Sequence, residues 1–384
     1  MAEPVSDDVR LHGDLISRQG SRRDLNTPVL VLELDALDRN IARMAELAKQ
    51  AGVRLRPHAK THKSLDIALR QLAAGAVGVC CAKLGEAEAL AAGGVTGLHI
   101  TSPVVSAPAI QRLMALNART ERLSVVVDNP ENCDALARAA SPDRPLGVFV
   151  DVDPGIRRTG VTSPEAAAEL AAQVIRSPGL RYEGVQMYCG SQQHIESYAD
   201  RRAAIVDRTD YLRSVIAALV AAGAAPAVVT GCGTGTHRID IELGVFTELQ
   251  VGSYVFMDDQ YAACDLTGEA AQPFERSLHV DARVISANAE MLVTVDAGFK
   301  AFSTDADPPT IAAGAPEGTR YIFMGDEHGA LIAPGIAQTL RVGDPVSLNV
   351  PHCDPTVNLY DSYHVVSGDT LVDIWPVTAR GRSR

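Results

Sequence analysis

A lysine flanked by histidines stands where a short strand should end, in the segment Arg56-Pro-His-Ala-Lys-Thr-His-Lys63. Parallel α/β folds gather their chemistry at the carboxyl ends of their strands. A buried lysine at such a place loses solvation, so its pKa falls and its amine can form a Schiff base with an aldehyde cofactor such as pyridoxal 5′-phosphate (PLP). A solvated basic loop would also explain these eight residues, so other segments must decide between the two interpretations.

Two further segments carry groups that suit PLP. The segment Asp151-Val-Asp-Pro-Gly-Ile-Arg-Arg-Thr-Gly160 follows a strand-like run, and either Arg157 or Arg158 could reach the phenolate oxygen of the cofactor. Strand-end arginines also make structural salt bridges, which is the alternative. Tyr188, with His194 shortly after it, could lie against the pyridine ring or could be one more core aromatic.

Two glycine-containing loops could hold a phosphate. Thr230-Gly-Cys-Gly-Thr-Gly-Thr236 follows another strand-like run, and exposed backbone N–H groups and hydroxyls of this kind cradle phosphates. The next such run ends in Gln250-Val-Gly-Ser-Tyr254, which offers a second pair of N–H and hydroxyl groups. Either loop alone could be a simple turn, but the phosphate site of a barrel commonly forms at its last two strands.

A candidate metal pair, His352 and Asp354, lies between two prolines just beyond an apolar strand-like run. Residues two apart on extended backbone face the same way, so we expect both side chains to bind one ion while Cys353 points elsewhere. Nitrogen plus carboxylate suits Mn²⁺, Mg²⁺ or Co²⁺ and leaves coordination positions for water and substrate. Because this spacing is common by chance, a surface pair without an ion is the alternative.

Strand-like runs alternate with alanine-rich helical stretches from about residue 50 to 255. They position the lysine-containing segment, the segments that suit PLP and the two glycine-containing loops. The candidate strands are Val53–Arg56, Val77–Cys81, Leu98–Thr101, Ser124–Val127, Gly147–Val152, Gly184–Tyr188, Ala227–Thr230 and Glu248–Val251. Eight strands with helices between them predict an α/β protein with a (β/α)₈ barrel of the TIM type, although an open doubly wound sheet fits the same count.

The last third of the chain has a different character. Its strand-like runs, separated by Gly and Pro turns, are His279–Ile285, Met291–Asp296, Tyr321–Met324, Pro345–Val350 and Leu371–Trp375. They predict a C-terminal all-β domain. We therefore expect a PLP-binding barrel over residues 36–262 and a β domain over 263–384 that carries the metal site. The early strand 27–34 is one too many for the barrel and is assigned to the β domain.

Composition narrows the class of protein. The chain has 384 residues, 46% of them apolar, which is enough for a large core. A formal net charge of −12 argues against nucleic acid and anionic membranes as partners. No apolar run is long enough to span a bilayer, and the first residues lack the regions of a signal peptide. Seven scattered cysteines without CxxC spacing indicate reduced thiols, so we expect a cytoplasmic protein.

Taken together, these segments resemble the D-threonine aldolase and D-serine dehydratase family, whose barrel is shared with alanine racemase (fold-type III PLP enzymes). The matching motifs run in order along nearly the whole chain: PxLxLxLDALxxNI (Pro28–Ile41), RPHAKTHKS (Arg56–Ser64), ELQVGSYVFMD (Glu248–Asp258), DAGFKAFSTD (Asp296–Asp305), GDEHG (Gly325–Gly329) and PHCD (Pro351–Asp354). As an ordered set they are far more specific than any single piece.

The resemblance implies that Lys60, not Lys63, holds PLP as a Schiff base, with Arg158 near its phenolate oxygen and Tyr188 beside its ring. It places Gln250 opposite the pyridine nitrogen, where a neutral amide cannot hold that nitrogen protonated as a carboxylate would. The remaining expected cofactor-binding residues come from the two glycine-containing loops: Thr230, Gly233, Thr234, Gly252, Ser253 and Tyr254. It also implies a homodimer, with the β domain of one chain completing the site on the other's barrel.

The metal pair separates the branches of the family. D-threonine aldolases resemble His-x-Asp at this position and dehydratases His-x-Cys, so Asp354 favours an aldolase, although a shifted register could offer Cys353 instead. The expected reaction is the PLP- and metal-dependent cleavage of D-threonine and related D-3-hydroxy-amino acids to glycine and an aldehyde, with Mn²⁺ as the expected ion. His194, His62 or a metal-bound hydroxide would be the base.

Four alternatives stay open from the sequence. A D-serine or 3-hydroxyaspartate dehydratase would use the same cofactor to form a keto acid and ammonia. A 3-hydroxyaspartate aldolase would need a cationic group for the extra carboxylate. A non-catalytic PLP-carrying protein would resemble the barrel alone, and an alanine racemase would need a tyrosine acid from the β domain that the sequence does not identify.

Overall fold

The computed structural model describes residues 6–384 and contains two compact units. The barrel unit comprises Ala42–Gly252, Cys264–Pro273 and Gly381–Arg384. The β unit comprises the described residues up to Ile41, Ser253–Ala263 and Phe274–Arg380. Helix α2 (Leu34–Ala51) therefore begins in the β unit and ends in the barrel unit.

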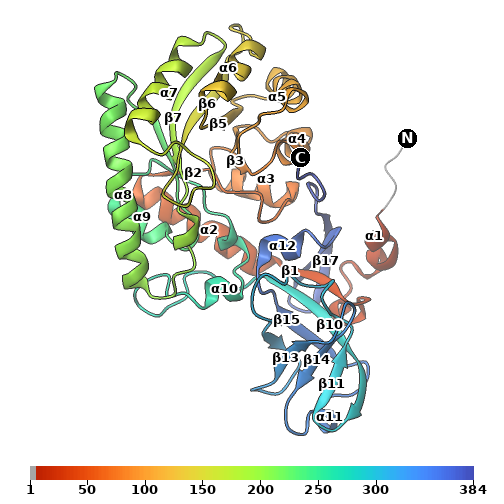
Figure 1. The fold of residues 1–384 in the computed structure, drawn as a ribbon. Coiled ribbons are helices and arrows are strands. Elements are labelled where there is room, and N and C mark those ends of the chain that lie inside the picture. Colours follow the sequence, from red (N-terminus) through yellow and green to blue (C-terminus); the bar gives the residue numbers. More distant parts are fainter. Residues whose placement is uncertain (1–5) are drawn as a thin grey trace. The chain divides into compact units, whose positions relative to one another are not determined.

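The barrel unit is built on an eight-stranded sheet in which all paired neighbours are parallel, in the order β2-β9-β8-β7-β6-β5-β4-β3 (Figure 1). Its strands are β2 (Arg54–Leu55), β3 (Val79–Cys81), β4 (Leu98–Ile100), β5 (Ser124–Val127), β6 (Leu146–Val152), β7 (Leu180–Met187), β8 (Val228–Gly231) and β9 (Glu248–Leu249). A parallel bridge joins His58, just after β2, to Cys80 in β3. This bridge closes the sheet, which confirms the predicted (β/α)₈ barrel.

Helices follow the strands on the outside of the barrel. They are α3 (Leu65–Ala73), α4 (Leu84–Ala92), α5 (Ala107–Arg119), α6 (Pro130–Ala139), α7 (Pro164–Arg176), α8 (Tyr198–Ala221) and α9 (His237–Leu243), with the short η3 (Gly190–Gln192) before α8. Side chains of Ser106, Asn129 and Ser163 accept backbone N–H groups at the starts of α5, α6 and α7, each of which has proline in its first turn. Strands β5 and β6 are wholly buried, as strands covered on both faces must be.

Strand β7 begins at Leu180, four residues before its predicted start at Gly184. In the structure Gly184 lies inside the strand with φ +143°. A Cβ at this position would come within 1.9 Å of the Val228 carbonyl oxygen, so the close approach of β8 requires glycine.

The β unit contains a nine-stranded sheet, in which β13-β14-β11-β10-β1-β16-β17 form one path and β15 pairs with β10 and β12. Its strands are β1 (Val29–Glu33), β10 (Leu278–Ala289), β11 (Leu292–Val295), β12 (Ile311–Ala313), β13 (Arg320–Phe323), β14 (Gly329–Ile332), β15 (Pro345–Asn349), β16 (Ser362–Ser367) and β17 (Thr370–Pro376). Its short helices are α1 (Asp7–His12), η1 (Gly13–Leu15), η2 (Ser21–Asp24), η4 (Ser253–Val255), α10 (Asp259–Ala262), α11 (Ile336–Thr339) and α12 (Cys353–Val357). Strand β1 pairs with β10 and β16, so the early strand lies in this sheet.

Two features of residues 6–384 test expectations from the sequence: the length and apolar character of the helices, and the state of the cysteines. Within residues 6–384, no helix combines the length and apolar character that crossing a bilayer requires. All seven cysteines are free and buried, and burial raises the pKa of the Cys80 and Cys81 thiols well above the ordinary value. These two neighbours in β3 are therefore protonated core residues without nucleophilic chemistry.

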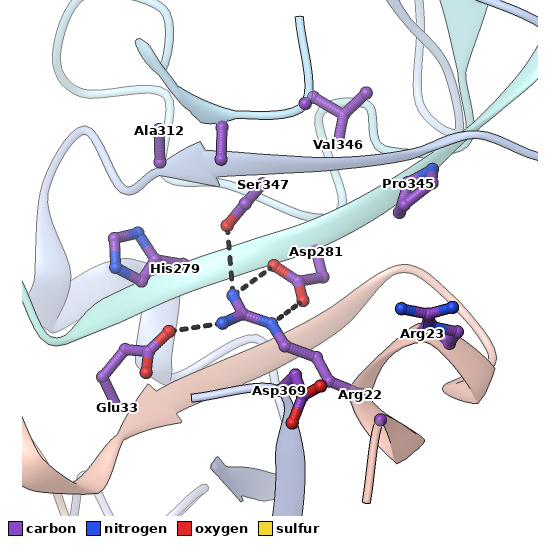
Figure 2. A pocket seen from close by; sticks show the side chains of 13 residues that line it. Arg22, Arg23, Glu33, His279, Asp281, Ala312, Pro345, Val346, Ser347 and Asp369 are labelled. Atoms are coloured by element: carbon purple, nitrogen blue, oxygen red, sulfur yellow. Dashed lines mark hydrogen bonds and ion pairs between the residues drawn. The ribbon is translucent and has the colours of Figure 1, made fainter. Parts of the chain in front are cut away.

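An ion-pair cluster around Arg22 lines a cavity of about 390 Å³ in the β unit (Figure 2). The guanidinium donates to both oxygens of Asp281 at 2.7 and 3.0 Å, and also to the Glu33 carboxylate and, at 3.4 Å, to the Ser347 hydroxyl. One side chain from η2 thus joins β1, β10 and β15. Its donors are used within the protein, so we assign this cluster to stability.

We expect Arg22→Ala to lower the free energy of unfolding by about 2–4 kcal/mol, because it leaves the buried carboxylate of Asp281 and the half-buried carboxylate of Glu33 without their cation. Urea unfolding followed by circular dichroism measures this change. The matched control is Arg23→Ala, which removes an exposed guanidinium on the same turn and should change the free energy by less than about 0.5 kcal/mol. Equal effects of the two variants would contradict the assignment.

Stability should fall as pH decreases from about 6.5 toward 4. Burial lowers the pKa of four histidines from 6.5 to about 4, namely His99, His237, His279 and His364. The unfolded chain binds these four protons first as the pH falls, which destabilises the fold. Burial raises the pKa of Asp151 and Asp240 from 3.8 to about 6, so the folded chain gains two protons earlier and part of the loss is offset. Unfolding temperatures between pH 7.5 and 4.5 test this, and a flat profile would contradict it.

Candidate functional site

The two lysines of the histidine-rich segment occupy different environments. Lys63 is buried, and its ammonium donates to the Glu86 carboxylate at 2.8 Å. Glu86 also accepts the backbone N–H groups of Ala82 and Lys83, so the ion pair anchors the start of α4. A protonated amine held by a buried carboxylate is not a nucleophile, which supports Lys60 as the Schiff-base residue.

Hydrogen bonds from two strand ends hold the turn that carries Lys60. Its backbone N–H donates to Nδ1 of His58 at 3.3 Å, and Nε2 of His58 lies 3.1 Å from the Thr101 hydroxyl. Because that hydroxyl donates to the Cys81 carbonyl, His58 donates from Nε2 and accepts at Nδ1. The ends of β3 and β4 therefore fix His58, two residues before the lysine.

A buried polar network crosses the inside of the barrel. The Gln186 amide on β7 donates to Oδ1 of Asp151 at 2.9 Å, and its carbonyl oxygen lies 2.9 Å from Nε2 of His99. Burial lowers the pKa of His99 to about 4 and raises that of Asp151 to about 6. Motif reasoning missed Gln186 and His99, whose only signal is a polar side chain inside an otherwise apolar strand.

The network fixes the orientation of Gln250. Its Nε2 donates to the carbonyl oxygen of Gln186 at 3.1 Å and to the Thr230 hydroxyl at 3.0 Å. The carboxylate of Asp151 requires the Gln186 amide nitrogen, which leaves the Gln186 oxygen as the acceptor. The carbonyl oxygen of Gln250 is thus the atom that remains to face a ligand.

The Thr230 hydroxyl is used within the protein. It accepts from Gln250 and donates to Glu248 at 3.2 Å, and Glu248 in turn receives both arms of Arg56 at 2.8 and 3.0 Å. Burial alone would raise the pKa of Glu248, but the hydrogen bonds and charge of Arg56 lower it. A phosphate role for the Thr230 side chain is therefore not supported.

The glycine-rich loop after β8 is tied to its neighbours. The Gly233 N–H donates to the Thr236 hydroxyl at 3.3 Å, and the Gly235 N–H donates to the side-chain oxygen of Gln193 at 2.9 Å. Thr234 is buried, and its carbonyl lies 2.7 Å from a ring nitrogen of His237. These hydrogen bonds hold the loop in its conformation. They also use the N–H groups of Gly233 and Gly235, which belong to the loop that was predicted to bind a phosphate.

The turn after β9 fits a phosphate better. A Cβ on Gly252 would lie 2.7 Å from the Thr61 hydroxyl. That hydroxyl is buried and has no hydrogen-bond partner among residues 6–384. This donor lies one residue after Lys60 and beside Gly252, which has no side chain. An anionic oxygen bound there would supply the missing acceptor. Ser253 and Tyr254, the other two predicted residues, are buried in η4 of the β unit.

Arg158 and Tyr188, which were both predicted to bind the cofactor, lie close to each other. The guanidinium carbon of Arg158 stands 5.3 Å from the ring centroid of Tyr188, and Arg158 has no ion pair among the residues described.

The two candidate bases differ in solvent exposure: His194 is exposed, whereas His62 is fully buried and accepts the Ser64 N–H at Nδ1. Its solvent exposure therefore favours His194 over His62 as the base.

In the β unit, His352 has a carboxylate partner. Its Nδ1 lies 2.8 Å from Oδ2 of Asp305, the last residue of the DAGFKAFSTD motif. The His352 carbonyl accepts the hydroxyls of Ser303 and Thr356, which holds the two segments together. A ring N–H donated to a carboxylate leaves Nε2 free as a metal ligand, so the donor set fits a divalent ion. The sequence motif contained Asp305, but its pairing with His352 depends on the fold.

The prediction of extended backbone from His352 to Asp354 is wrong. The chain is extended only at His352 and turns into helix α12 at Cys353, so the side chains do not alternate as in a strand. Cys353 is completely buried, and burial, with Asp258 and Asp354 nearby, raises the pKa of its thiol well above the ordinary value. A buried thiol is a poor ligand for an exchangeable ion, which favours Asp354 over Cys353 as the partner of His352.

Asp305→Ala should weaken binding of Mn²⁺ by about 10–100-fold, because His352 loses the carboxylate that orients its ring. Isothermal titration with Mn²⁺ measures the affinity directly, without reference to turnover. Asp307→Ala, an exposed residue of the same loop, is the matched control and should bind the ion as the unaltered protein does. An unchanged affinity in Asp305→Ala would show that the ion does not use His352 as arranged here.

A second cluster of possible ligands is excluded by its hydrogen bonds. Asp8, His12 and His364 are the only group of three within 4.8 Å of one another among residues 6–384. His12 accepts the Asn26 N–H at Nε2, so its proton sits on Nδ1, 2.8 Å from Nε2 of His364. That shared proton occupies the space an ion would need. The cluster is a neutral histidine pair.

Comparison with known proteins identifies the family of this chain. A model of the alanine racemase N-terminal domain matches residues 32–260, and a model of a serine dehydratase domain matches residues 277–366. A 3-hydroxy-D-aspartate aldolase from Paracoccus denitrificans is 38% identical over 94% of this chain and 93% of that protein. A D-threonine aldolase from Arthrobacter is 40% identical over 94% of each.

Among solved structures, that of D-threonine aldolase from Filomicrobium marinum matches with a TM-score of 0.89 and 38% identity, covering 94% of this chain and 97% of that one. The likeness thus extends over both units and not over the barrel alone. Fold, motif order and these relatives agree, and the chain belongs to the alanine racemase-like family of fold-type III PLP enzymes.

Proposed function

We propose that this protein is a carbon–carbon lyase that cleaves D-threonine and related D-3-hydroxy-amino acids to glycine and an aldehyde, using PLP and a divalent ion. The observation that carries the choice of an aldolase is the metal pair. Cys353 is buried as a thiol, whereas His352 is held by Asp305 and lies two residues before Asp354 in the sequence. The similarity to two aldolases over 94% of the chain supports the same choice.

The residues that would hold PLP are Lys60, Arg158, Tyr188, Gln250 and the turn at Gly252. PLP supplies an electron sink for the pair of electrons released when a bond to Cα breaks. Lys60 would bind it covalently, and Arg158 would keep its phenolate oxygen ionised. The carbonyl oxygen of Gln250 would accept a hydrogen bond from a protonated ring nitrogen, but as a neutral group it does not fix that proton.

The ion on His352 and Asp354, which we propose to be Mn²⁺, would lower the pKa of the substrate hydroxyl. Asp305 keeps the His352 proton on Nδ1, so Nε2 remains a ligand. His194 is the exposed imidazole near Tyr188 in the sequence, and we propose it as the group that takes the hydroxyl proton. As the Cα–Cβ bond breaks, the deprotonated hydroxyl oxygen would become the carbonyl oxygen of the aldehyde. The electron pair of that bond would remain with Cα, which then takes up a proton to give glycine.

Assembly and location follow from the family resemblance. We propose a homodimer in which the β domain of one chain completes the active site of the other. A net charge of −12 and the small-molecule chemistry of the site favour a cytoplasmic enzyme without nucleic acid or membrane partners. Sedimentation of the PLP-loaded protein tests the dimer.

The decisive experiment is to incubate the PLP-loaded, EDTA-treated protein with D-threonine, with and without Mn²⁺, and to identify the products. Glycine and acetaldehyde formed only with the ion would establish the proposed reaction. 2-Oxobutyrate and ammonia would identify a dehydratase instead and would contradict the proposal.

A further inference from the structure

The proposed base, His194, lies in the connection between β7 and α8 (residues 188–197) in the barrel unit. The His194 side chain is exposed, whereas the residue before it, Gln193, is fully buried. Burying a side-chain amide is costly unless its donors and its acceptor find partners within the protein. The partners of Gln193 therefore show what holds the backbone next to the base.

Three hydrogen bonds hold the Gln193 amide. Its Nε2 donates to the Cys189 carbonyl at 3.1 Å and to the Thr236 hydroxyl at 3.1 Å. Its Oε1 accepts the Gly235 N–H at 2.9 Å. Because a backbone carbonyl requires the amide nitrogen and a backbone N–H requires the oxygen, the orientation of this amide is fixed. Gln193 thus joins the connection that carries His194 to the glycine-rich loop after β8.

The glycine-rich loop has the shape that Gln193 requires. A Cβ on Gly235 would overlap the backbone oxygen of Gln193, and a Cβ on Gly233 would overlap its side-chain oxygen. Neither glycine has a positive φ, so their backbone conformation does not call for glycine. The close packing of Gln193 accounts for both glycines.

The chain on the other side of His194 is held by Arg201 of α8. This arginine is fully buried, and its guanidinium donates to the backbone carbonyls of Ile195, Glu196 and Asp265. The Asp265 N–H donates in turn to the Glu196 carbonyl at 2.9 Å. A buried side chain therefore fixes the backbone on each side of His194, while the imidazole itself stays exposed.

We infer that Gln193 is a positioning residue, which sets the place of His194 by seating the β7–α8 connection on the glycine-rich loop. The inference rests on the proposed aldolase function, in which His194 takes the hydroxyl proton. A general base must lie within hydrogen-bond reach of the proton that it removes, and a displacement of about 1 Å can lower the rate by about a hundredfold. An amide suits this task because it donates and accepts at once.

The first test is Gln193→Met, which keeps a side chain of similar length and removes its three hydrogen bonds. The kcat for glycine formation from D-threonine should fall by about tenfold or more while KM changes by less than about twofold, because the base acts in the transition state. Gln192→Met is the matched control, since the side-chain oxygen of Gln192 has no hydrogen-bond partner among the described residues. It should leave kcat and KM unchanged.

A double-mutant cycle distinguishes positioning of the base from a general loss of structure. His194→Ala should lower kcat by a factor about ten times smaller in Gln193→Met protein than in the unaltered protein, because the base is already misplaced there. Equal factors in the two backgrounds would overturn the inference.

Hydrogen–deuterium exchange of the PLP-loaded protein, followed by mass spectrometry, tests the link without turnover. In Gln193→Met, peptides over residues 188–197 and 231–236 should exchange about fivefold faster or more, while peptides elsewhere in the barrel unit should not change. Gln192→Met should exchange as the unaltered protein does. Unchanged exchange of both segments in Gln193→Met would overturn the inference. If the unaltered holoenzyme formed no glycine, the proposed function would fail instead, and with it the role of His194.

Discussion

Replacing Lys60 with alanine is expected to abolish the Schiff base with PLP and to reduce lyase activity by more than about a thousandfold. The amine is the only covalent attachment that the proposed site offers, and its loss also removes the group that would exchange with the substrate amine. The absorbance of the protein-bound Schiff base and the rate of glycine formation from D-threonine measure the two effects. The unfolding temperature should change little, because Lys60 is only half-buried.

Replacing Lys63 with alanine should have the opposite effects on stability and on Schiff-base formation. Lys63→Ala leaves the carboxylate of Glu86 buried without its cation, so we expect a loss of about 3–5 kcal/mol in the free energy of unfolding. Whatever Lys63→Ala protein remains folded should still form the Schiff base. Retention of the Schiff base in Lys60→Ala, together with its loss in folded Lys63→Ala, would reverse the assignment of the two lysines.

Replacing Asp354 with alanine is expected to lower cleavage of D-threonine by more than about a hundredfold while the absorbance of the Schiff base at Lys60 stays intact. The carboxylate is the proposed second ligand of the ion, and its removal should also weaken binding of Mn²⁺. Activity, absorbance and calorimetric titration with Mn²⁺ separate these roles.

Two outcomes would count against this assignment. If Asp354→Ala lost PLP together with activity, the residue would support the cofactor site and not only the ion. If Cys353→Ser, which keeps a small polar side chain, removed Mn²⁺ binding while Asp354→Ala did not, the buried thiol would be the ligand after all. We expect Cys353→Ser to bind Mn²⁺ normally, because the Cys353 side chain is fully buried.

Local patterns were sufficient for the barrel. Each of its eight strands was located to within a few residues, since an apolar run between helical stretches is a signal carried by neighbouring residues. In the β unit the same reasoning missed β12 (Ile311–Ala313), β14 (Gly329–Ile332) and β16 (Ser362–Ser367). The first two are short, and a strand of three or four residues exists only because a partner strand pairs with it.

The sequence by itself determined the fold class, the order of the motifs and, through their resemblance to a family, the cofactor and the type of reaction. Only the tertiary structure decided how individual groups are used. Glu86 lies 23 residues from Lys63 and pairs with it, and Asp305 lies 47 residues from His352 and orients it. Such pairs depend on long-range packing, and spacing along the chain does not encode them.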